Sequence, residues 1–458
     1  MANLIAVISK YVMIFLMVIY TYANFRFFTL SDPEKQRKVC GRQNRCMFCI
    51  HFLAYLTLSL RAENEGIRMM LWAFFGAQVV FFLCYIYLYR PIYRNVSRLL
   101  VNNTCMLLCV GMIMLTRISM ARGSLDNVLR QFVIVVASAA VTWLIPYVME
   151  RFWQLYRLQW IYAGAGIALL LVVCVAGNTS FGAQLSLTIG GVSLQPSEFV
   201  KITFVFFAAA MFYQSLEFQT ILVTTAAAAA HVVILALSRD LGGAFLFFVT
   251  YVAMLFVATG KWLYLAAGTG GGVLAAMGGY RLFGHVQRRV SAWMNPWADI
   301  ENTGYQITQS LFAIGTGGWF GMGLCQGMPQ KIPVVEKDFI FSAIAEELGG
   351  IFAVCVILIC LGCFLQFMLI ATRMQAVFYK LIAVGLGLED IAQVFLTVGG
   401  GTKFIPSTGV TLPFVSYGGS SILSTFILFG VMQGLHILKL DDEEELEMEE
   451  VQLRNVKR

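Results

Sequence analysis

The sequence predicts an all-α, polytopic membrane protein, and three features of its composition and pattern support this prediction. Hydrophobic residues make up 59% of the 458 residues and charged residues only 12%, whereas a soluble domain carries about 25% charged residues. Apolar stretches long enough to cross a bilayer recur along the chain, and they lack the alternation of apolar and polar residues that a membrane β-barrel needs. The 41 glycines suit closely packed helices in lipid.

About thirteen segments meet the requirement of roughly 20 mostly apolar residues for a spanning helix. We therefore expect an accessory three-helix membrane region at 1–98, a ten-helix core at 99–438 and an acidic tail at 439–458. The segments centre on residues 11–30, 47–60, 69–89, 99–118, 131–148, 159–176, 198–213, 219–237, 243–259, 262–283, 340–370, 376–399 and 420–438.

Basic residues in the short loops predict the orientation, because Lys and Arg are enriched on the cytoplasmic side. The clusters at 35–45 and 90–98 place the N-terminus outside and the C-terminal tail in the cytoplasm. Arg117, Arg122 and Arg130 contradict this pattern. Four segments are then expected outside: 177–197, 238–243, 284–338 and 400–420.

The eleven cysteines do not predict a disulfide framework, because most lie in apolar runs where a thiol behaves as a small hydrophobe. Cys40, Cys46, Cys49 and His51 have the residue types of a zinc site. However, Cys49 and His51 fall where a spanning helix begins, and zinc needs four converging ligands. We predict no metal site there.

The outer segments carry ionisable residues at membrane depth, which are usually functional because hydrocarbon penalises a charge unless it is paired or faces water. The alternative is structural ion pairing, of Glu198 with Lys201 or of Arg239 with acidic neighbours, and both interpretations stay open. The connection 284–338 is long enough to be functional or to contain helices of its own. The ionisable residues singled out in these segments and in the adjoining helix starts are Glu198, Lys201, Arg239, Asp240, Asp338, Glu346 and Glu347.

Asp338 follows Lys337 and precedes the apolar run 339–341, so its carboxylate is expected at the boundary between water and membrane. Glycosyl transfer to a sugar hydroxyl needs a general base, and a carboxylate at this boundary suits that role. A leaving diphosphate needs Lys or Arg, or a divalent cation such as Mg²⁺ or Mn²⁺. Candidate cations on the same side are Arg239, Arg281, Lys331, Lys337 and Lys403.

Seven stretches in the second part of the chain resemble the signatures of the SEDS family, the RodA/FtsW/SpoVE proteins of shape, elongation, division and sporulation. The resemblance runs from about residue 99 to 438 and keeps the order and spacing of the motifs. The stretches are QPSE at 195–198, DLGG at 240–243, GYQITQS at 304–310, GMG at 321–323, KDFIF at 337–341, EELG at 346–349 and GVTLPFVSYGGSS at 409–421.

This resemblance implies a ten-helix core in the bacterial cytoplasmic membrane and a peptidoglycan glycosyltransferase that uses lipid II as donor and acceptor. It places the essential Asp of the family on Asp338 and implies a class B penicillin-binding protein as partner, in contact with membrane lipids. The surplus of basic residues is expected to mark cytoplasmic loops rather than nucleic-acid binding. An outward site for the substrate would also include residues from the other motifs. The full set of predicted substrate-binding residues is Glu198, Lys201, Arg239, Gln309, Ser310, Lys403, Thr411, Ser416 and Ser420.

The chain departs from the family pattern in two places. Division-type members often carry Lys where this chain has Thr408, and Lys403 replaces a glycine, so the elongation and sporulation branches match better. The three additional helices of 1–98 are expected to serve packing or partner binding and to be dispensable for chemistry. Two alternatives to a polymerase are a lipid II flippase and a non-catalytic scaffold of the wall-synthesis complex. The absence of a convincing internal repeat argues against the flippase.

Overall fold

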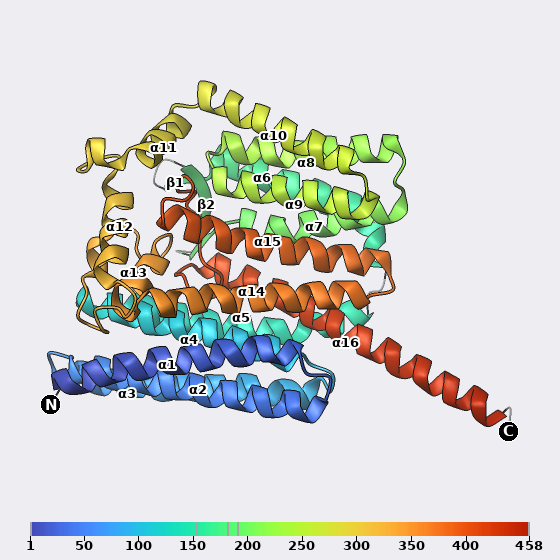
Figure 1. Ribbon diagram of the computed structural model, residues 1–458. Helices are drawn as coiled ribbons and strands as arrows, with labels where there is room; N and C mark the ends of the chain where they lie inside the picture. The colour runs from blue at the N-terminus through green and yellow to red at the C-terminus, as the bar shows by residue number, and fades with distance from the viewer. Residues whose placement is uncertain (1, 152–153, 181–182, 190–191, 457–458) are drawn as a thin grey trace.

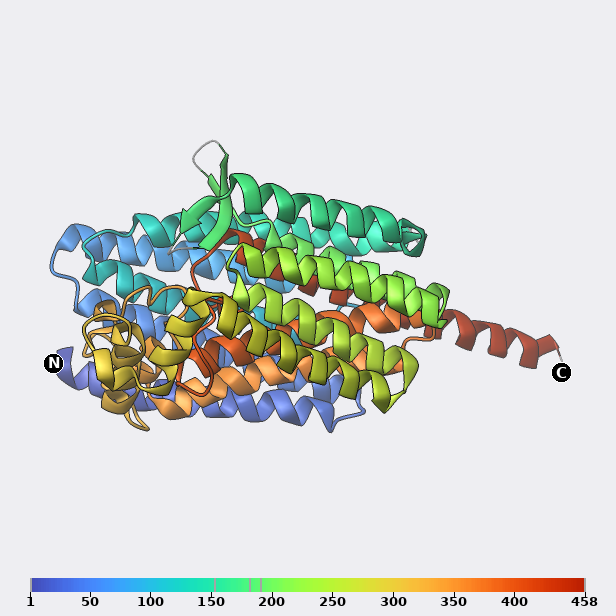
Figure 2. The ribbon, with the colours of Figure 1, turned by 90° about the horizontal axis from the view of Figure 1, so that it is seen from above.

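The computed structural model describes residues 2–456 apart from 152–153, 181–182 and 190–191, and long helices running side by side dominate it (Figure 1). The N-terminus and the connection 284–338 lie at one end of the bundle, and the C-terminus lies at the other (Figures 1 and 2). The predicted all-α, multi-pass membrane fold is confirmed.

The predicted segments all fall on helices. Ten helices of the described residues are long and apolar enough to cross a membrane. Three other predicted segments, on α2, α7 and α10, fall outside that set, so the count of thirteen spans stays a prediction. The bundle consists of α1 (Ala2–Phe28), α2 (Pro33–Leu60), α3 (Glu65–Ile92), α4 (Arg98–Ala121), α5 (Asp126–Arg151), η1 (Leu155–Leu158), α6 (Gln159–Ala176), α7 (Ser197–Gln214), α8 (Phe218–Leu237), α9 (Leu241–Thr259), α10 (Trp262–Leu282), α14 (Gly350–Arg373), α15 (Val377–Gly401) and α16 (Gly419–Val456).

The long connection after α10 contains short helices, as the length of this segment predicts. It continues directly into the helix that follows Asp338. These elements cluster at the N-terminal end of the bundle (Figure 1). They are α11 (Gly284–Met294), η2 (Pro296–Asp299), α12 (Tyr305–Gly317), η3 (Pro329–Lys331) and α13 (Ile340–Leu348).

The expectation of one helical segment over 340–370 is wrong, because the chain breaks at Gly349 between α13 and α14. Gly349 has φ 94° and ψ 163°, a conformation that only glycine adopts without strain. The break lets the loop after α12 cross the helix ends: Gly350 N donates to Gly318 O at 2.8 Å, and Ile351 N donates to Trp319 O at 3.2 Å.

A small antiparallel sheet lies between α6 and α7, and the sequence analysis missed it. Its strands are β1 (Asn178–Ser180), β2 (Ala183–Ile189) and β3 (Val192–Leu194), in the order β1-β2-β3. The run 185–189 alternates apolar and polar residues, which is the pattern of a strand. Just beyond β3, Gln195 N donates to Ser420 Oγ at 2.9 Å, so the sheet is joined to the first turn of α16.

The acidic tail is part of α16, which continues without a break to Val456 and extends past the other helices (Figure 1). The sequence analysis placed the tail in a separate segment. The last two of its residues, 457–458, lie outside the described part of the chain.

Helix α4 lies at the centre of the bundle and is buried over its whole apolar length. α14 and α5 cover one part of its surface, and α2 and α3 cover another. Asn102 Nδ2 of α4 donates to Cys40 O of α2 at 3.0 Å, and polar side chains of α4 also form side-chain to side-chain hydrogen bonds with the first two helices. These are Tyr20 Oη to Asn103 Oδ1 (3.1 Å), Asn103 Nδ2 to Asn24 Oδ1 (2.9 Å), Asn102 Nδ2 to Gln43 Oε1 (3.1 Å), and one of 3.0 Å between the hydroxyls of Tyr55 and Thr116.

The break at Gly349 gives a test of the fold. A Cβ on this residue would lie 2.4 Å from Gly321 N, in addition to the strain of its positive φ. Gly349→Ala should therefore cost about 2 kcal/mol or more of stability, measured as a lower unfolding temperature of the detergent-solubilised protein. Gly270→Ala is the matched control, because a Cβ there meets no atom within 4 Å. Equal unfolding temperatures for the two variants would contradict a break that depends on glycine at this position.

Candidate functional site

Asp338 lies in the turn that leads into α13. Figure 1 shows α13 at the end of the bundle that carries the connection 284–338. Phe339 follows it and is buried, so the carboxylate lies just above the apolar interior. The loop between α15 and α16 crosses this turn: a Cβ on Gly409 would lie 3.7 Å from Asp338 Oδ2. Gly409 has φ 78°, which favours glycine at this approach.

The same loop holds the backbone of the turn. Ser416 Oγ donates to Lys337 O at 2.6 Å and accepts from Leu412 N at 2.9 Å. Tyr417 N donates to Glu336 O at 2.6 Å. Ser416 is buried and its hydroxyl is committed to these two bonds, so it positions the residue next to Asp338.

Burial raises the pKa of Asp338 to about 6, and the positive charges of Lys337 and Arg289 oppose this rise. A carboxyl group with this pKa is ionised at neutral pH and can still accept a proton. The structure therefore supplies one basic carboxylate with two cationic neighbours.

Arg289 is the neighbour that the sequence analysis missed. It lies on α11, and its Nη1 donates to Ser407 O at 3.1 Å, so it also contacts the loop after α15. Burial lowers the pKa of Arg289, and the negative charges of Asp338 and Asp240 oppose this shift. The sequence does show two adjacent arginines, at 288 and 289, in a segment expected outside the membrane. Their spacing along the chain could not show that Arg289 lies near Asp338 in the folded protein.

Asp240 caps the N-terminus of α9, where its Oδ1 accepts from Gly243 N at 2.9 Å. Burial raises its pKa, while this bond and Arg289 lower it. Arg239, a predicted substrate-binding residue, has φ 64° in the preceding turn. The pKa of His285 on α11 is lowered by burial and then by Arg239, Arg289 and Arg288, so these arginines lie near His285. Of the three, Arg289 also acts on both carboxylates.

Glu198 and Lys201 form the ion pair that the sequence analysis held open, at 2.8 Å and largely buried. Lys201 Nζ also donates to Gln393 Oε1 at 2.9 Å, and Gln393 Nε2 donates to Thr411 O at 2.9 Å. Thr411 in turn shares a hydrogen bond of 2.7 Å with Ser421. This network ties α7 and α15 to the loop that covers Asp338, and Gln393 is the member that the sequence analysis missed.

The other predicted substrate-binding residues lie around this loop in different settings. Ser310 is fully buried and bonds to Ser342 Oγ and Gly401 O at 2.5 and 2.7 Å, which disfavours direct contact with a ligand. Gln309 and Lys403 are half-buried, and Lys403 O accepts from Trp293 Nε1 of α11. Ser420 accepts the bond from Gln195 described above.

Of the other candidate cations, Lys337 lies beside Asp338 and contributes to its electrostatics. Arg281 at the end of α10 and Lys331 in η3 are both exposed. Lys337 is therefore the half-buried candidate beside Asp338, whereas Arg239, like Arg281 and Lys331, is exposed.

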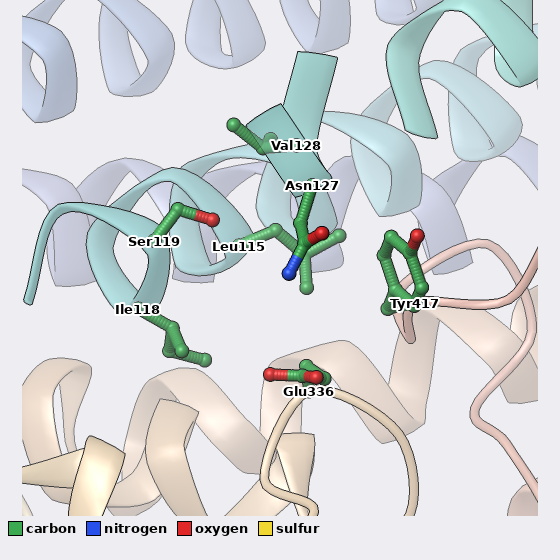
Figure 3. Close-up of a pocket in the computed structure, with 7 residues that line it drawn as sticks. All are labelled: Leu115, Ile118, Ser119, Asn127, Val128, Glu336 and Tyr417. Carbon is green, nitrogen blue, oxygen red and sulfur yellow. The ribbon is translucent and has the colours of Figure 1, made fainter. Parts of the chain in front are cut away.

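Two arginines that contradicted the charge pattern are paired with acids that flank Asp338 in the sequence. Arg117 Nε donates to Glu347 Oε1 at 2.8 Å, and Arg117 Nη2 donates to Gly327 O at 3.0 Å. Arg122 pairs with Glu336. Glu336 also lines a small cavity of about 10 Å³ with Tyr417 and residues of α4 and α5 (Figure 3), room for about one water. Both arginines therefore form ion pairs with acids at the site end of the bundle.

The possible zinc ligands of α2 do not converge. His51 Nε2 bonds to Gln78 Oε1 at 3.0 Å, and Cys49 is exposed whereas Cys40 and Cys46 are buried. In the described part of the chain, no three His, Cys, Asp or Glu side chains are placed to hold a metal ion.

These features define a multi-pass membrane protein whose basic carboxylate and cations gather at one end of a helical bundle. Comparison with known sequences then identifies its family. Residues 98–439 match the FtsW/RodA/SpoVE family of cell cycle proteins, and the chain belongs to that family.

Relatives and a solved structure agree with this assignment. The peptidoglycan glycosyltransferase RodA of Mycobacterium bovis is 33% identical over 298 residues, which cover 61% of this chain and 64% of that protein, less than two thirds of its length. RodA of Mycobacterium leprae is 27% identical over 421 residues, which cover 85% of this chain and 90% of that protein. Because 98–458 is a smaller share of the chain than 85%, this match includes part of the N-terminal region.

A solved structure has the same fold at 22% identity. It is described as showing structural coordination of polymerization and crosslinking by a peptidoglycan synthase complex. The TM-score is 0.65, and the match covers 75% of this chain and 98% of that one.

The buried pair of Arg117 and Glu347 predicts a large effect on stability. Burial raises the pKa of Glu347 to about 7, and Arg117 is the main opposing charge. Arg117→Met should cost about 3 kcal/mol or more, because it leaves the carboxyl group buried without its partner. The free energy of unfolding in mixed detergent micelles measures this cost.

Two further variants complete this experiment. Adding Glu347→Gln to Arg117→Met should recover part of the loss, because the unpaired acid is then gone. Arg122→Met breaks the more exposed pair and should cost at most about 1 kcal/mol. Equal costs for the two arginine variants would show that burial of the pair does not matter.

Proposed function

We propose that this protein is a peptidoglycan glycosyltransferase that polymerises lipid II into glycan strands at the outer face of the bacterial cytoplasmic membrane. The observation that carries the proposal is the placement of Asp338, a carboxylate with a raised pKa between Lys337 and Arg289 at one end of the bundle. The names of the RodA relatives support the same reaction. Lipid II fits such a site because its sugars and diphosphate lie at the membrane surface while its polyprenyl chain stays in lipid.

In the proposed reaction Asp338 is the general base. The hydroxyl oxygen of the acceptor sugar forms a bond to the anomeric carbon of the donor, and the bond from that carbon to the diphosphate breaks. The hydroxyl proton passes to Asp338. Because Ser416 and Tyr417 hold the backbone before Asp338, the carboxylate keeps its position during proton transfer.

Positive charge would stabilise the diphosphate as it leaves. Arg289 lies near both Asp338 and Asp240, and the exposed Arg239 directly precedes Asp240 in the chain. An arginine can bind phosphate oxygens through two hydrogen bonds. A divalent cation is compatible with this arrangement, because Mg²⁺ is often bound by one or two carboxylates together with substrate phosphates. Asp338 is the carboxylate that would hold it.

Two other functions lead to different outcomes in the same assay. A flippase would move lipid II across a membrane without joining sugars, and a scaffold would act only by recruiting a transpeptidase. The gathering of ionisable groups at one end of the bundle favours chemistry at one membrane surface. A class B penicillin-binding protein is the proposed partner, by analogy with the synthase complex of the same fold.

Asp338→Asn should lower the rate of glycan formation from lipid II by at least about 100-fold, while the protein still accumulates and folds. Asn keeps the size of the side chain but cannot accept the proton. The assay uses purified protein with lipid II, alone and with its transpeptidase, and detects glycan chains on a gel. Full activity of this variant would remove Asp338 from the role of base.

The pH dependence of the unmodified protein provides an internal check. Asp338 is protonated below its pKa of about 6, so the rate should fall about tenfold per pH unit below that value and level off above it. A rate that rises as the pH falls would show that the essential form of the group is an acid.

The orientation gives an independent prediction. Glu34 is exposed near the start of α2, and Ser291 is exposed on α11 at the other end of the bundle. In intact cells an impermeant thiol reagent should label Ser291→Cys but not Glu34→Cys, with labelling of the native cysteines subtracted. Glu34→Cys should react once the cells are permeabilised. The opposite pattern would place the candidate site in the cytoplasm and contradict the proposed reaction.

A further inference from the structure

The first helix of the chain contacts the candidate-site end of the bundle directly. Lys10 Nζ donates to Gly321 O at 3.2 Å, and the neighbouring Tyr11 ring lies 5.9 Å from the ring of Phe320. The Lys10 ammonium also lies 4.8 Å from the centre of the Tyr11 ring. A half-buried lysine thus ends on a backbone carbonyl of a loop more than 300 residues away in sequence.

That loop, residues 318–323, is joined to the helix that follows Asp338. Met322 N donates to Glu346 O and Gly323 N donates to Glu347 O, both at 2.8 Å. A Cβ on Gly321 would lie 2.4 Å from Glu347 O, so the backbones are packed as closely as glycine permits. A shift of this loop would therefore shift the end of α13.

The N-terminal helices reach the same region by a second route. α2 covers α4 and bonds to its buried polar side chains, as described above. Arg117 near the far end of α4 and Arg122, which directly follows this helix, pair with Glu347 and Glu336, which flank Asp338 in the sequence. Both routes start in residues 1–98 and reach the segment 336–347, which consists of the Asp338 turn and α13.

We infer that the three N-terminal helices hold the Asp338 turn in its working position and that Lys10 is a positioning residue of the site. This role differs from the expectation that the helices of 1–98 serve only packing or partner binding and are dispensable for chemistry. Lys10 acts through Gly321 and α13 and contacts no reacting atom. The expected change in the rate of lipid II polymerisation rests on the proposed function. The expected change in the order of the loop 318–323 does not.

The test compares Lys10→Met with Lys35→Met in nanodiscs. Met keeps the apolar stem of Lys10 but removes the donor to Gly321. Lys35 is an exposed residue of α2 that pairs with Asp32 at the other end of the bundle. Polymerisation of lipid II should show a kcat about tenfold lower for Lys10→Met with a KM within about twofold. Lys35→Met should match the unmodified protein.

Backbone hydrogen exchange supplies the second measurement. Exchange of residues 318–323 should accelerate in Lys10→Met and not in Lys35→Met, and Lys10→Arg should restore both kcat and protection. A normal kcat, or a reduced kcat with unchanged exchange of this loop, would overturn the inference. If the unmodified protein makes no glycan, the proposed function fails, and exchange of the loop alone then decides whether Lys10 holds it.

Discussion

Every polar group that a helix carries into this bundle needs a partner inside the protein, because hydrocarbon offers none. The structure provides such partners in one way inside the helical bundle and in another way at the end that carries the candidate site. Within the bundle, Asn102 and Asn103 of α4 bond to neighbouring helices, and Lys201 is shared between Glu198 and Gln393. At the site end, irregular backbone replaces helix, and side chains such as Ser416 satisfy its carbonyls. The Asp338 turn keeps its shape because Ser416 and Tyr417 bond to the backbone just before it.

The helices could be predicted from sequence because long apolar runs have few other structures open to them in a membrane. The exceptions have physical causes. The break between α13 and α14 depends on the backbone conformation of Gly349 and on its contact with residues near Gly321, and neither affects hydropathy. The sheet before α7 consists of strands of only three to seven residues. Such short strands give a weak signal beside long apolar runs.

Some residues of the candidate site could likewise be predicted from the sequence, and others could not. Asp338 could be singled out because its position between a lysine and an apolar run is a local property of the sequence. Arg289 and Gln393 could not, because their importance comes from tertiary neighbours, a carboxylate in one case and an ammonium in the other. Ser310 shows the converse: its motif pointed to a substrate, whereas its hydroxyl is used to join three helices. A motif therefore identifies a region better than it identifies the contact made by each member.

The complete burial of α4 has a consequence for how the protein is made. A chain enters the membrane from its N-terminus as it is synthesised, so α1 and α2 are already in place when α4 follows. The helices that carry the hydrogen-bond partners of Asn102, Asn103 and Thr116 are therefore in the bilayer before α4 enters it. α14, which covers another part of α4, is translated more than 200 residues later. During that interval, hydrogen bonds to the N-terminal helices keep the side chains of Asn102 and Asn103 from facing lipid without a partner. The N-terminal helices would thus help α4 to insert before the rest of the bundle exists.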